Sequence, residues 1–338
     1  MTSEFVHLHN HSDYSLLDGA QTVQTLVNTV DDLGMDSVAL TEHGNMFSVI
    51  PYYKSAKSAG IKPIIGCETY VAMGSRFDKK PRSDGGWGNN HLVLLAKDYT
   101  GYQNLMKLVT HGYLEGFYYR PRIDIELLKK HSDGLICLSG CLKGEIPEKM
   151  LKDDWKGAQE AALRFAEIFP DRFYLEVQNH GIPDEEKNIQ NIKKLSNELD
   201  IPMVCTNDAH YAKHEHWEAH DVHICLGTGK DRNDPNRLRY ATPEFYFKSQ
   251  DQMFELFKDI PGAIENTRKI ADSIDIEIPM GDYHLPNFPL PKDLPEQSPD
   301  SYLKTLCEQG VKERYGDYTK ELSDRLDHEL NVINQMGF

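Results

Sequence analysis

Histidine and acidic residues of this 338-residue chain gather in short segments at the ends of apolar runs. In His7-Leu8-His9, two imidazoles lie two residues apart within a strand-like run, so both point to the same face. Residues 206–210, Thr-Asn-Asp-Ala-His, repeat this spacing with a carboxylate and an imidazole. These groups together are typical ligands of Zn²⁺ and also suit Mn²⁺ or Fe²⁺. The recurrence indicates a metal site, which one His-x-His pair would not establish.

Further candidate ligands follow, or lie within, other strand-like runs. His43 ends the second run, Glu68 lies in the third, and Cys141 follows the fifth. Asp18 follows the first run, directly before a glycine. Each has a plain structural reading, because Asp before Gly fits a turn and Cys fits a small buried apolar position. Their common placement near strand ends is what favours a shared site.

Seven strand-like runs alternate with helix-like ones through about the first 210 residues. The predicted strands are Phe5–His9, Ser37–Thr41, Pro63–Val71, His91–Ala96, Gly134–Ser139, Arg172–Gln178 and Pro202–Thr206. Apolar residues at helical spacing, as in residues 23–30, fill the intervals. The alternation predicts an α/β fold with parallel strands closed into a barrel. The carboxyl ends of such strands share one rim, where we expect the candidate ligands to meet.

His91 departs from this scheme. It opens its apolar run, whereas the other candidates lie within or after theirs. Barrel geometry with parallel strands gives no reason to place the start of a strand on the ligand-bearing rim. Spacing alone therefore leaves His91 open between a metal ligand and an ordinary strand residue.

The sequence changes character after about residue 280. Prolines at 286, 289, 291, 295 and 299 fall in one stretch that sustains neither a helix nor a central strand. A final amphipathic helix is predicted from Leu322, Leu326, Leu330 and Ile333. We therefore divide the chain into residues 1–280 and residues 281–338. Because no later element covers that helix, we expect the chain to be part of a longer one.

Composition excludes several classes of protein. The chain has 37 Lys and Arg against 53 Asp and Glu, a net charge of −16, which argues against a general nucleic-acid-coating surface. Its six cysteines include no C-x-x-C pair, so neither a disulfide framework nor a zinc ribbon is predicted. No apolar run approaches roughly 18 residues, and the first five residues do not resemble a signal peptide. We expect a cytoplasmic protein that does not enter a membrane.

Two groups outside the strand ends also draw attention. Tyr119, Arg120 and Arg122 are candidate nucleic-acid contacts, the arginines for phosphate and the tyrosine for base stacking. A solvated basic turn explains them equally well.

Histidines at 216, 220 and 223 share one helix face, and we interpret them as solvated because no strand carboxylate lies beside them in the sequence.

Together these segments resemble the polymerase and histidinol phosphatase (PHP) domain family. The resemblance rests on His7-Leu8-His9, Asp18, Thr41-Glu42-His43-Gly44, Glu68, His91, Cys141 and Asp208-Ala209-His210. Within that family, the chain is most similar to the N-terminal region of bacterial replicative DNA polymerases, over essentially its whole length. The resemblance implies a distorted (β/α)₇ barrel. It also implies that residues 281–338 are a linker and the short, mainly helical start of the polymerase palm.

The resemblance further implies a centre of up to three metal ions, with Zn²⁺ expected. The three proposed sets are His7, His9, Glu68 and Asp208; Glu68, His91 and Cys141; and Asp18, His43 and His210. All of these positions hold residues able to bind a metal. Acting through the ions, His9, Glu68 and Asp208 are the expected catalytic residues. His11 is expected to be a neighbour of the ligands and not a ligand itself.

Such a centre suits hydrolysis of phosphate esters, because divalent cations bind the phosphate and lower the pKa of a bound water toward about 7. We expect 3′-to-5′ exonuclease activity on DNA, in the service of DNA replication. The expected partners are DNA, the rest of the polymerase chain, the proofreading exonuclease subunit and other replisome subunits. One alternative is a silent scaffold that docks that exonuclease subunit. Another is a phosphatase of small phosphomonoesters such as histidinol phosphate.

Overall fold

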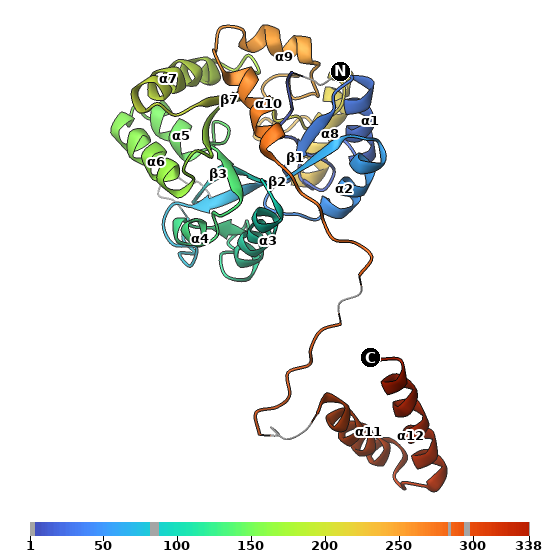
Figure 1. The fold of residues 1–338 in the computed structure, drawn as a ribbon. Coiled ribbons are helices and arrows are strands. Elements are labelled where there is room, and N and C mark those ends of the chain that lie inside the picture. Colours follow the sequence, from blue (N-terminus) through green and yellow to red (C-terminus); the bar gives the residue numbers. More distant parts are fainter. Residues whose placement is uncertain (1–3, 82–87, 283–284, 294–297, 338) are drawn as a thin grey trace. The chain divides into compact units, whose positions relative to one another are not determined.

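The computed structural model describes residues 4–81, 88–282, 285–293 and 298–337. The chain forms two compact units, residues 1–278 and residues 279–338. The first unit contains the sheet with its surrounding helices, and the second contains two helices (Figure 1).

A seven-stranded sheet forms the centre of the first unit. Its strands are β1 (Ser37–Leu40), β2 (Lys62–Ala72), β3 (Asn89–Ala96), β4 (Arg122–Ile123), β5 (Leu135–Leu138), β6 (Phe173–Val177) and β7 (Met203–Cys205). Their order is β1-β2-β3-β5-β6-β7, and β4 pairs with β2. Nearly all of their residues are buried, which explains why the strands stand out as continuous apolar runs.

Strand direction differs from the all-parallel prediction at β3. The pairs β1–β2, β5–β6 and β6–β7 are parallel, but β3 runs antiparallel to both β2 and β5. The described residues between β2 and β3 form no helix that could carry the chain back across the sheet, as a parallel connection requires. As a result His91, near the start of β3, pairs with Tyr70, near the end of β2.

The first predicted strand, Phe5–His9, is not a regular strand. Instead, His7 forms a single bridge to Val38 and Asn10 forms one to Ala209. The Asn10 amide donates to the carbonyl of Ala39 at 2.9 Å, so a side chain replaces part of the backbone ladder. This segment links the β1 edge of the sheet to the residues after β7, and the curled sheet fits the distorted α/β barrel that the family resemblance implied.

Helices cover the sheet on its outside (Figure 1). They are α1 (Val23–Asp32), α2 (Val49–Ser58), α3 (Tyr99–Leu114), α4 (Ile125–Lys130), α5 (Glu145–Leu151), α6 (Trp155–Ile168), α7 (Pro183–Leu199), α8 (Trp217–Thr228), α9 (Gln250–Phe257) and α10 (Ala263–Ser273), with a short 3₁₀ turn at His214–His216. In α1 the predicted apolar stripe is buried, and Thr22 caps the helix by accepting a hydrogen bond from the Thr25 amide. Helix α10 contacts β7, where Asn266 donates to the Met203 carbonyl at 2.7 Å.

The second unit consists of α11 (Pro299–Tyr315) and α12 (Lys320–Gln335). Lys304 and Asp327 form an ion pair of 3.0 Å between the two helices. The amphipathic helix predicted at residues 322–333 is confirmed as part of α12. Residues 285–293 contain neither helix nor strand, as their prolines predict, and Pro295 lies outside the described residues. No helix in the described part of the chain is both long and apolar enough to span a membrane.

Candidate metal centre

The candidate ligands gather at one rim of the barrel. His43, Cys141, Asp208 and His210 follow parallel strands, and Glu68 lies within β2. His91 joins them because β3 is antiparallel, so that its first residues lie beside the last residues of β2. Strand direction therefore explains the one candidate that spacing left open.

The first group consists of His9, His11 and Asp208, whose ligand atoms all lie within 4.8 Å of one another. Asp208 Oδ1 is 3.3 Å from His9 Nε2 and 3.0 Å from His11 Nε2. The Nδ1 atoms of the same two rings form hydrogen bonds on the side away from the cluster. His9 Nδ1 bonds Glu176 Oε1 at 2.7 Å, and His11 Nδ1 bonds Ser15 Oγ at 2.9 Å. Such contacts orient imidazole ligands, and here they turn both Nε2 atoms toward the cluster.

Glu68 lies at the middle of the second group, with His43 and His91. Its Oε1 is 2.6 Å from His91 Nδ1, and its Oε2 contacts His43 Nδ1. Cys141 Sγ lies 3.9 Å from both Glu68 Oε1 and His91 Nδ1. Glu68 Oε1 is also 3.6 Å from His9 Nε2, so this carboxylate lies between the first and second groups.

The third group consists of His11, His43 and His210, again within 4.8 Å of one another. Asp18 lies beside it, because Asp18 Oδ1 is 3.2 Å from His43 Nε2 and Asp18 Oδ2 is 3.9 Å from His210 Nε2. The structure thus brings together all but one of the predicted ligands.

Two backbone features fix the loops that carry these ligands. A Cβ atom on Gly19 would lie 1.7 Å from the carbonyl oxygen of Ser12, so only glycine permits the turn after Asp18. Asp208 has a φ of +46°, in the left-handed region, which Asp tolerates better than most residues. The adjacent Ala209 carbonyl accepts a hydrogen bond from the His11 amide at 2.9 Å, which ties the two ligand loops together.

His7 does not join the cluster, contrary to the prediction. Its Nε2 bonds the carbonyl oxygen of Lys248 at 2.9 Å, and its ring packs against Phe5 and Phe247. Burial lowers the pKa of His7 to about 4, which keeps the ring neutral. The period-two argument failed because the segment forms isolated bridges and not a regular strand.

His11 lies beside His9 in the cluster and is more than the neighbour of the ligands that its sequence position predicts. A signal for it was present, because His9-Asn10-His11 has the same spacing as His7-Leu8-His9. Spacing could not choose between the two pairs, and the bridge from Asn10 to Ala209 decides in favour of the second.

The cluster contains buried polar atoms that face one another without forming hydrogen bonds of good geometry. Among the described residues, six of its buried atoms are of this kind: His9 Nε2, His11 Nε2, Asp18 Oδ1, His43 Nδ1, Glu68 Oε2 and Asp208 Oδ1. A buried polar atom without a partner costs about 1–3 kcal/mol, so such atoms are rare and need a physical reason. Lone pairs of nitrogen and oxygen that converge on one place fit divalent cations.

The ionisation of the cluster is set by mutual attraction. Burial alone raises the pKa of the Glu68 carboxyl, but His91 and His43 beside it bring that pKa well below its usual range. Burial likewise lowers the pKa of His9, yet the surrounding carboxylates, Asp208 foremost, raise it to about 10. Protons on His9 and His43 therefore balance the buried carboxylates, and a cation bound there would take the place of those protons.

Two residues after the last strand support the third group. His220 is buried, contrary to the prediction that it is solvated, and its Nε2 donates to the Asp18 carbonyl at 2.7 Å. Helical periodicity gave no sign that this face of α8 packs on the loop of Asp18. No sequence pattern marks Tyr240, yet its hydroxyl is 2.9 Å from His210 Nε2 and 3.2 Å from Asp18 Oδ2.

The candidate nucleic-acid contacts divide into two kinds. Arg122 is only 2% exposed, and its guanidinium donates to the backbone carbonyls of Gly116, Arg76 and Asp78 at 3.0–3.2 Å. It holds the fold together and does not face a phosphate, which corrects the prediction. Tyr119 is 61% exposed, and Arg120 is half-buried with its guanidinium 5.7 Å from the centre of the Tyr70 ring.

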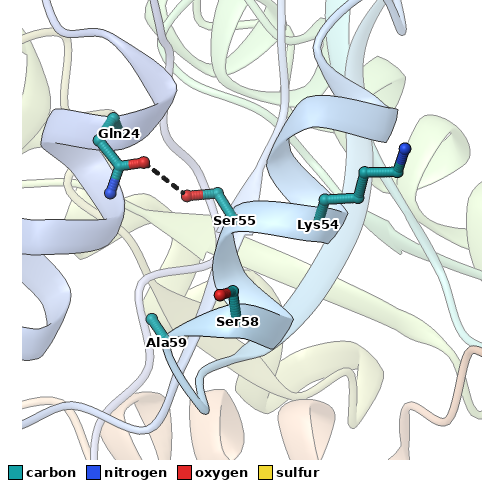
Figure 2. Close-up of a pocket in the computed structure, with 5 residues that line it drawn as sticks. All are labelled: Gln24, Lys54, Ser55, Ser58 and Ala59. Carbon is teal, nitrogen blue, oxygen red and sulfur yellow. Dashed lines mark hydrogen bonds between the residues drawn. The ribbon is translucent and has the colours of Figure 1, made fainter.

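A hollow of about 380 Å³ lies on the outside of the barrel between α1 and α2. Figure 2 shows its lining residues Gln24, Lys54, Ser55, Ser58 and Ala59, with the Ser55 hydroxyl donating to Gln24 at 3.2 Å. None of the candidate ligands lines this hollow, so the site chemistry lies elsewhere.

The sequence pattern of the PHP domain matches residues 7–180, about half of the chain. The chain belongs to the PHP domain family. Asp208, His210 and Tyr240 lie after the matched range, which includes the other residues described in the cluster: His9, His11, Asp18, His43, Glu68, His91, Cys141 and Glu176.

Full-length relatives of this PHP domain chain are DNA polymerase III alpha subunits. The chain is 46% identical over 337 residues to that of Borreliella burgdorferi, and 45% identical over 335 residues to that of Treponema pallidum. Each match covers 99% of this chain but only 29% and 28% of the relative. The Thermus aquaticus subunit is 42% identical, over 94% of this chain and 26% of its own length. The chain thus matches the N-terminal region of these subunits and spans less than a third of their length.

Solved structures give a weaker likeness. A protein of Bifidobacterium adolescentis described as a metal-dependent phosphoesterase aligns at 12% identity with a TM-score of 0.40, covering 75% of this chain and 95% of that protein. A two-domain Bacteroides vulgatus protein described as containing a PHP-like phosphoesterase aligns at 16% identity with a TM-score of 0.39, covering 61% and 52%. At these values the likeness adds nothing to the family match.

Proposed function

We propose that this PHP domain is a metal-dependent phosphodiesterase that trims DNA from its 3′ end. The observation that carries the proposal is the convergence of buried imidazole nitrogen and carboxylate oxygen atoms on one rim of the barrel, where they face one another without well-formed hydrogen bonds. Similarity to DNA polymerase III alpha subunits supports DNA as the substrate and the rest of such a polymerase as the partner.

The proposed ligands differ from the sequence prediction at one position, because His11 replaces His7. They are His9, His11, Asp18, His43, Glu68, His91, Cys141, Asp208 and His210. Zn²⁺ is the proposed metal, since imidazole, carboxylate and thiolate ligands suit it, and Mn²⁺ or Fe²⁺ are the next choices. Bound there, such ions would supply charge stabilisation for the phosphate and activation of water.

The chain's own part is to hold the ligands in position. Glu176 accepts hydrogen bonds from His9 Nδ1 at 2.7 Å, from the Gly140 amide at 3.0 Å and from Gln178 Nε2 at 3.1 Å. One buried carboxylate therefore orients His9 and fixes the start of the loop that carries Cys141. The loss of such a contact typically lowers metal affinity or activity 10- to 100-fold.

Arg120 and Tyr119 are the proposed contacts for the DNA strand. The guanidinium of Arg120 lies over Tyr70, whose ring centre is 5.1 Å from that of His91 and 6.4 Å from that of His43. One aromatic ring thus separates this arginine from two proposed ligands. Tyr119 offers an exposed ring for stacking on an unpaired base.

A matched pair of variants can test whether His11 or His7 belongs to the ligand set. His11→Gln is expected to lose at least one bound ion per chain, because it removes an Nε2 atom from the cluster. His7→Gln is expected to keep all ions, because His7 bonds the Lys248 carbonyl and the glutamine amide can still donate. Elemental analysis of the two proteins after gel filtration gives the comparison. Equal metal loss in a folded His7→Gln protein would contradict the proposed set.

A second matched pair separates DNA contact from structure. Arg120→Ala is expected to weaken binding of single-stranded DNA and to reduce the salt slope by about one, with an unchanged melting temperature. Arg122→Ala is expected to cost several kcal/mol of stability, because it leaves carbonyl oxygens without a donor at about 1–3 kcal/mol each. Fluorescence anisotropy at several salt concentrations and thermal melting measure the two effects. An Arg122→Ala protein of normal stability would overturn this division.

The proposed activity is tested with single-stranded DNA labelled at its 5′ end. We expect products shortened stepwise from the 3′ end, no cleavage in the presence of a chelator, and recovery when Zn²⁺ or Mn²⁺ is added. A protein with its full complement of metal that leaves DNA intact would support the scaffold alternative. Hydrolysis of histidinol phosphate without DNA cleavage would support the phosphomonoesterase alternative.

A further inference from the structure

Tyr240 meets two proposed ligands from a segment outside the residues that match the PHP pattern. It lies between α8 and α9, and its ring packs edge-on against Phe245 and His220, with ring centres 4.5 Å and 4.8 Å apart. These contacts keep its hydroxyl 2.9 Å from His210 Nε2 and 3.2 Å from Asp18 Oδ2. The hydroxyl is not one of the proposed metal ligands.

The hydrogen bonds of His210 decide which way the Tyr240 bond points. His210 Nδ1 lies 2.7 Å from the carbonyl oxygen of Asp208, and a carbonyl only accepts, so Nδ1 carries the proton. In the neutral ring Nε2 then has one lone pair and no hydrogen, so the Tyr240 hydroxyl, whose hydrogen also reaches Asp18 Oδ2, is the donor to it. One lone pair can accept a hydrogen bond or bind a cation, but not both.

We propose that Tyr240 gates the metal position formed by Asp18, His43 and His210, by filling the coordination position of His210 until a divalent cation displaces its hydroxyl. This rests on the ligand set proposed above, but not on hydrolysis of DNA. His9 Nε2 and His11 Nε2 have no such competitor among the described residues. The gated position therefore binds its cation last and most weakly of the three.

Displacement of the hydroxyl requires little movement. Asp18 Oδ2 already lies 3.2 Å from it, so the O–H can change acceptor within the same site. The cation must still replace the buried hydrogen bond between Tyr240 and His210. The loss of such a bond lowers the affinity for the cation about tenfold, which equals about 1.4 kcal/mol. Tyr240→Phe removes this competitor and keeps the packing ring.

The test is a titration of metal-free protein with Co²⁺, followed by absorption, and with Zn²⁺ in competition with a chelator of known affinity. In Tyr240→Phe we expect the weakest equivalent to bind about tenfold more tightly and the tighter equivalents to be unchanged. Asp18→Asn identifies that weakest equivalent, which it should weaken selectively. Tyr246→Phe is the matched control. Tyr246 lies on the same loop as Tyr240, and its hydroxyl accepts a hydrogen bond from Gln252 at 2.8 Å and forms no hydrogen bond with a proposed ligand among the described residues.

Equal or weaker binding of the last equivalent in Tyr240→Phe overturns the gate, and so does a gain of the same size in Tyr246→Phe. A protein that binds no ion at this position in either form overturns it as well. Retention of the tighter equivalents reports that the variant is folded. Failure to trim DNA with every position filled would contradict the proposed function and leave the gate standing.

Discussion

Replacing Glu68 with glutamine is expected to abolish DNA trimming, with a rate loss of at least about 10³-fold. The Glu68 carboxylate lies between the first and second groups, 3.6 Å from His9 Nε2 and 2.6 Å from His91 Nδ1. An amide carries no charge and offers a single acceptor oxygen, so neither group keeps its ion. Metal ions stabilise the transition state by several kcal/mol, and each 1.36 kcal/mol is a factor of ten in rate. Initial rates on 5′-labelled DNA, with metal content measured on the same samples, give the result.

Glu176→Gln is the graded control for this variant. Glu176 bonds His9 Nδ1 from behind but is not itself a proposed ligand. We expect it to lose about 10- to 100-fold in rate and to keep most of its metal, as is usual when an orienting contact is lost. A Glu68→Gln protein that is folded, loaded with metal and within tenfold of the normal rate would refute a central role for Glu68.

Removal of the metal is expected to lower the melting temperature of the barrel by about 10 °C or more. Without cations, the cluster keeps six buried polar atoms that face one another without hydrogen bonds of good geometry among the described residues. An ion that binds only the folded state stabilises it by about 4 kcal/mol when its free concentration is a thousand times its Kd. In a domain of this size, each kcal/mol shifts the melting temperature by roughly 2–4 °C.

Differential scanning calorimetry with and without a chelator measures this shift, and added Zn²⁺ should restore the original melting temperature. Glu68→Gln provides the control, since a protein that has lost the ions of the first and second groups should show a smaller change on chelation. A melting temperature that chelation leaves unchanged in the unmodified protein would mean that the cluster is stable without cations, and would remove the physical reason for placing ions there.

Strand positions and most of the rim could be predicted from the sequence because they depend on local rules. Buried strands are continuous apolar runs, and His43, Glu68 and Asp208 lie within or just after such runs. Parallel strands bring those ends to one rim. The same rule could not place His91, because strand direction depends on how the chain returns between β2 and β3.

The remaining differences come from tertiary contacts that no local pattern contains. The choice between His7 and His11 depends on where isolated bridges to Val38 and Ala209 interrupt the first segment. Burial of Arg122 depends on three backbone carbonyls that converge on it from other parts of the chain. Tyr240 reaches the centre through a loop without helix or strand periodicity, so nothing in its sequence neighbourhood marked it.

The most direct measurement is anomalous X-ray diffraction from crystals of this chain grown with Zn²⁺, recorded on both sides of the zinc absorption edge. We predict peaks among His9, His11 and Asp208 and among His43, Glu68 and His91, with a weaker peak beside Asp18 and His210. A difference map without peaks in this cluster, or with its strongest peak beside His7, would contradict the account.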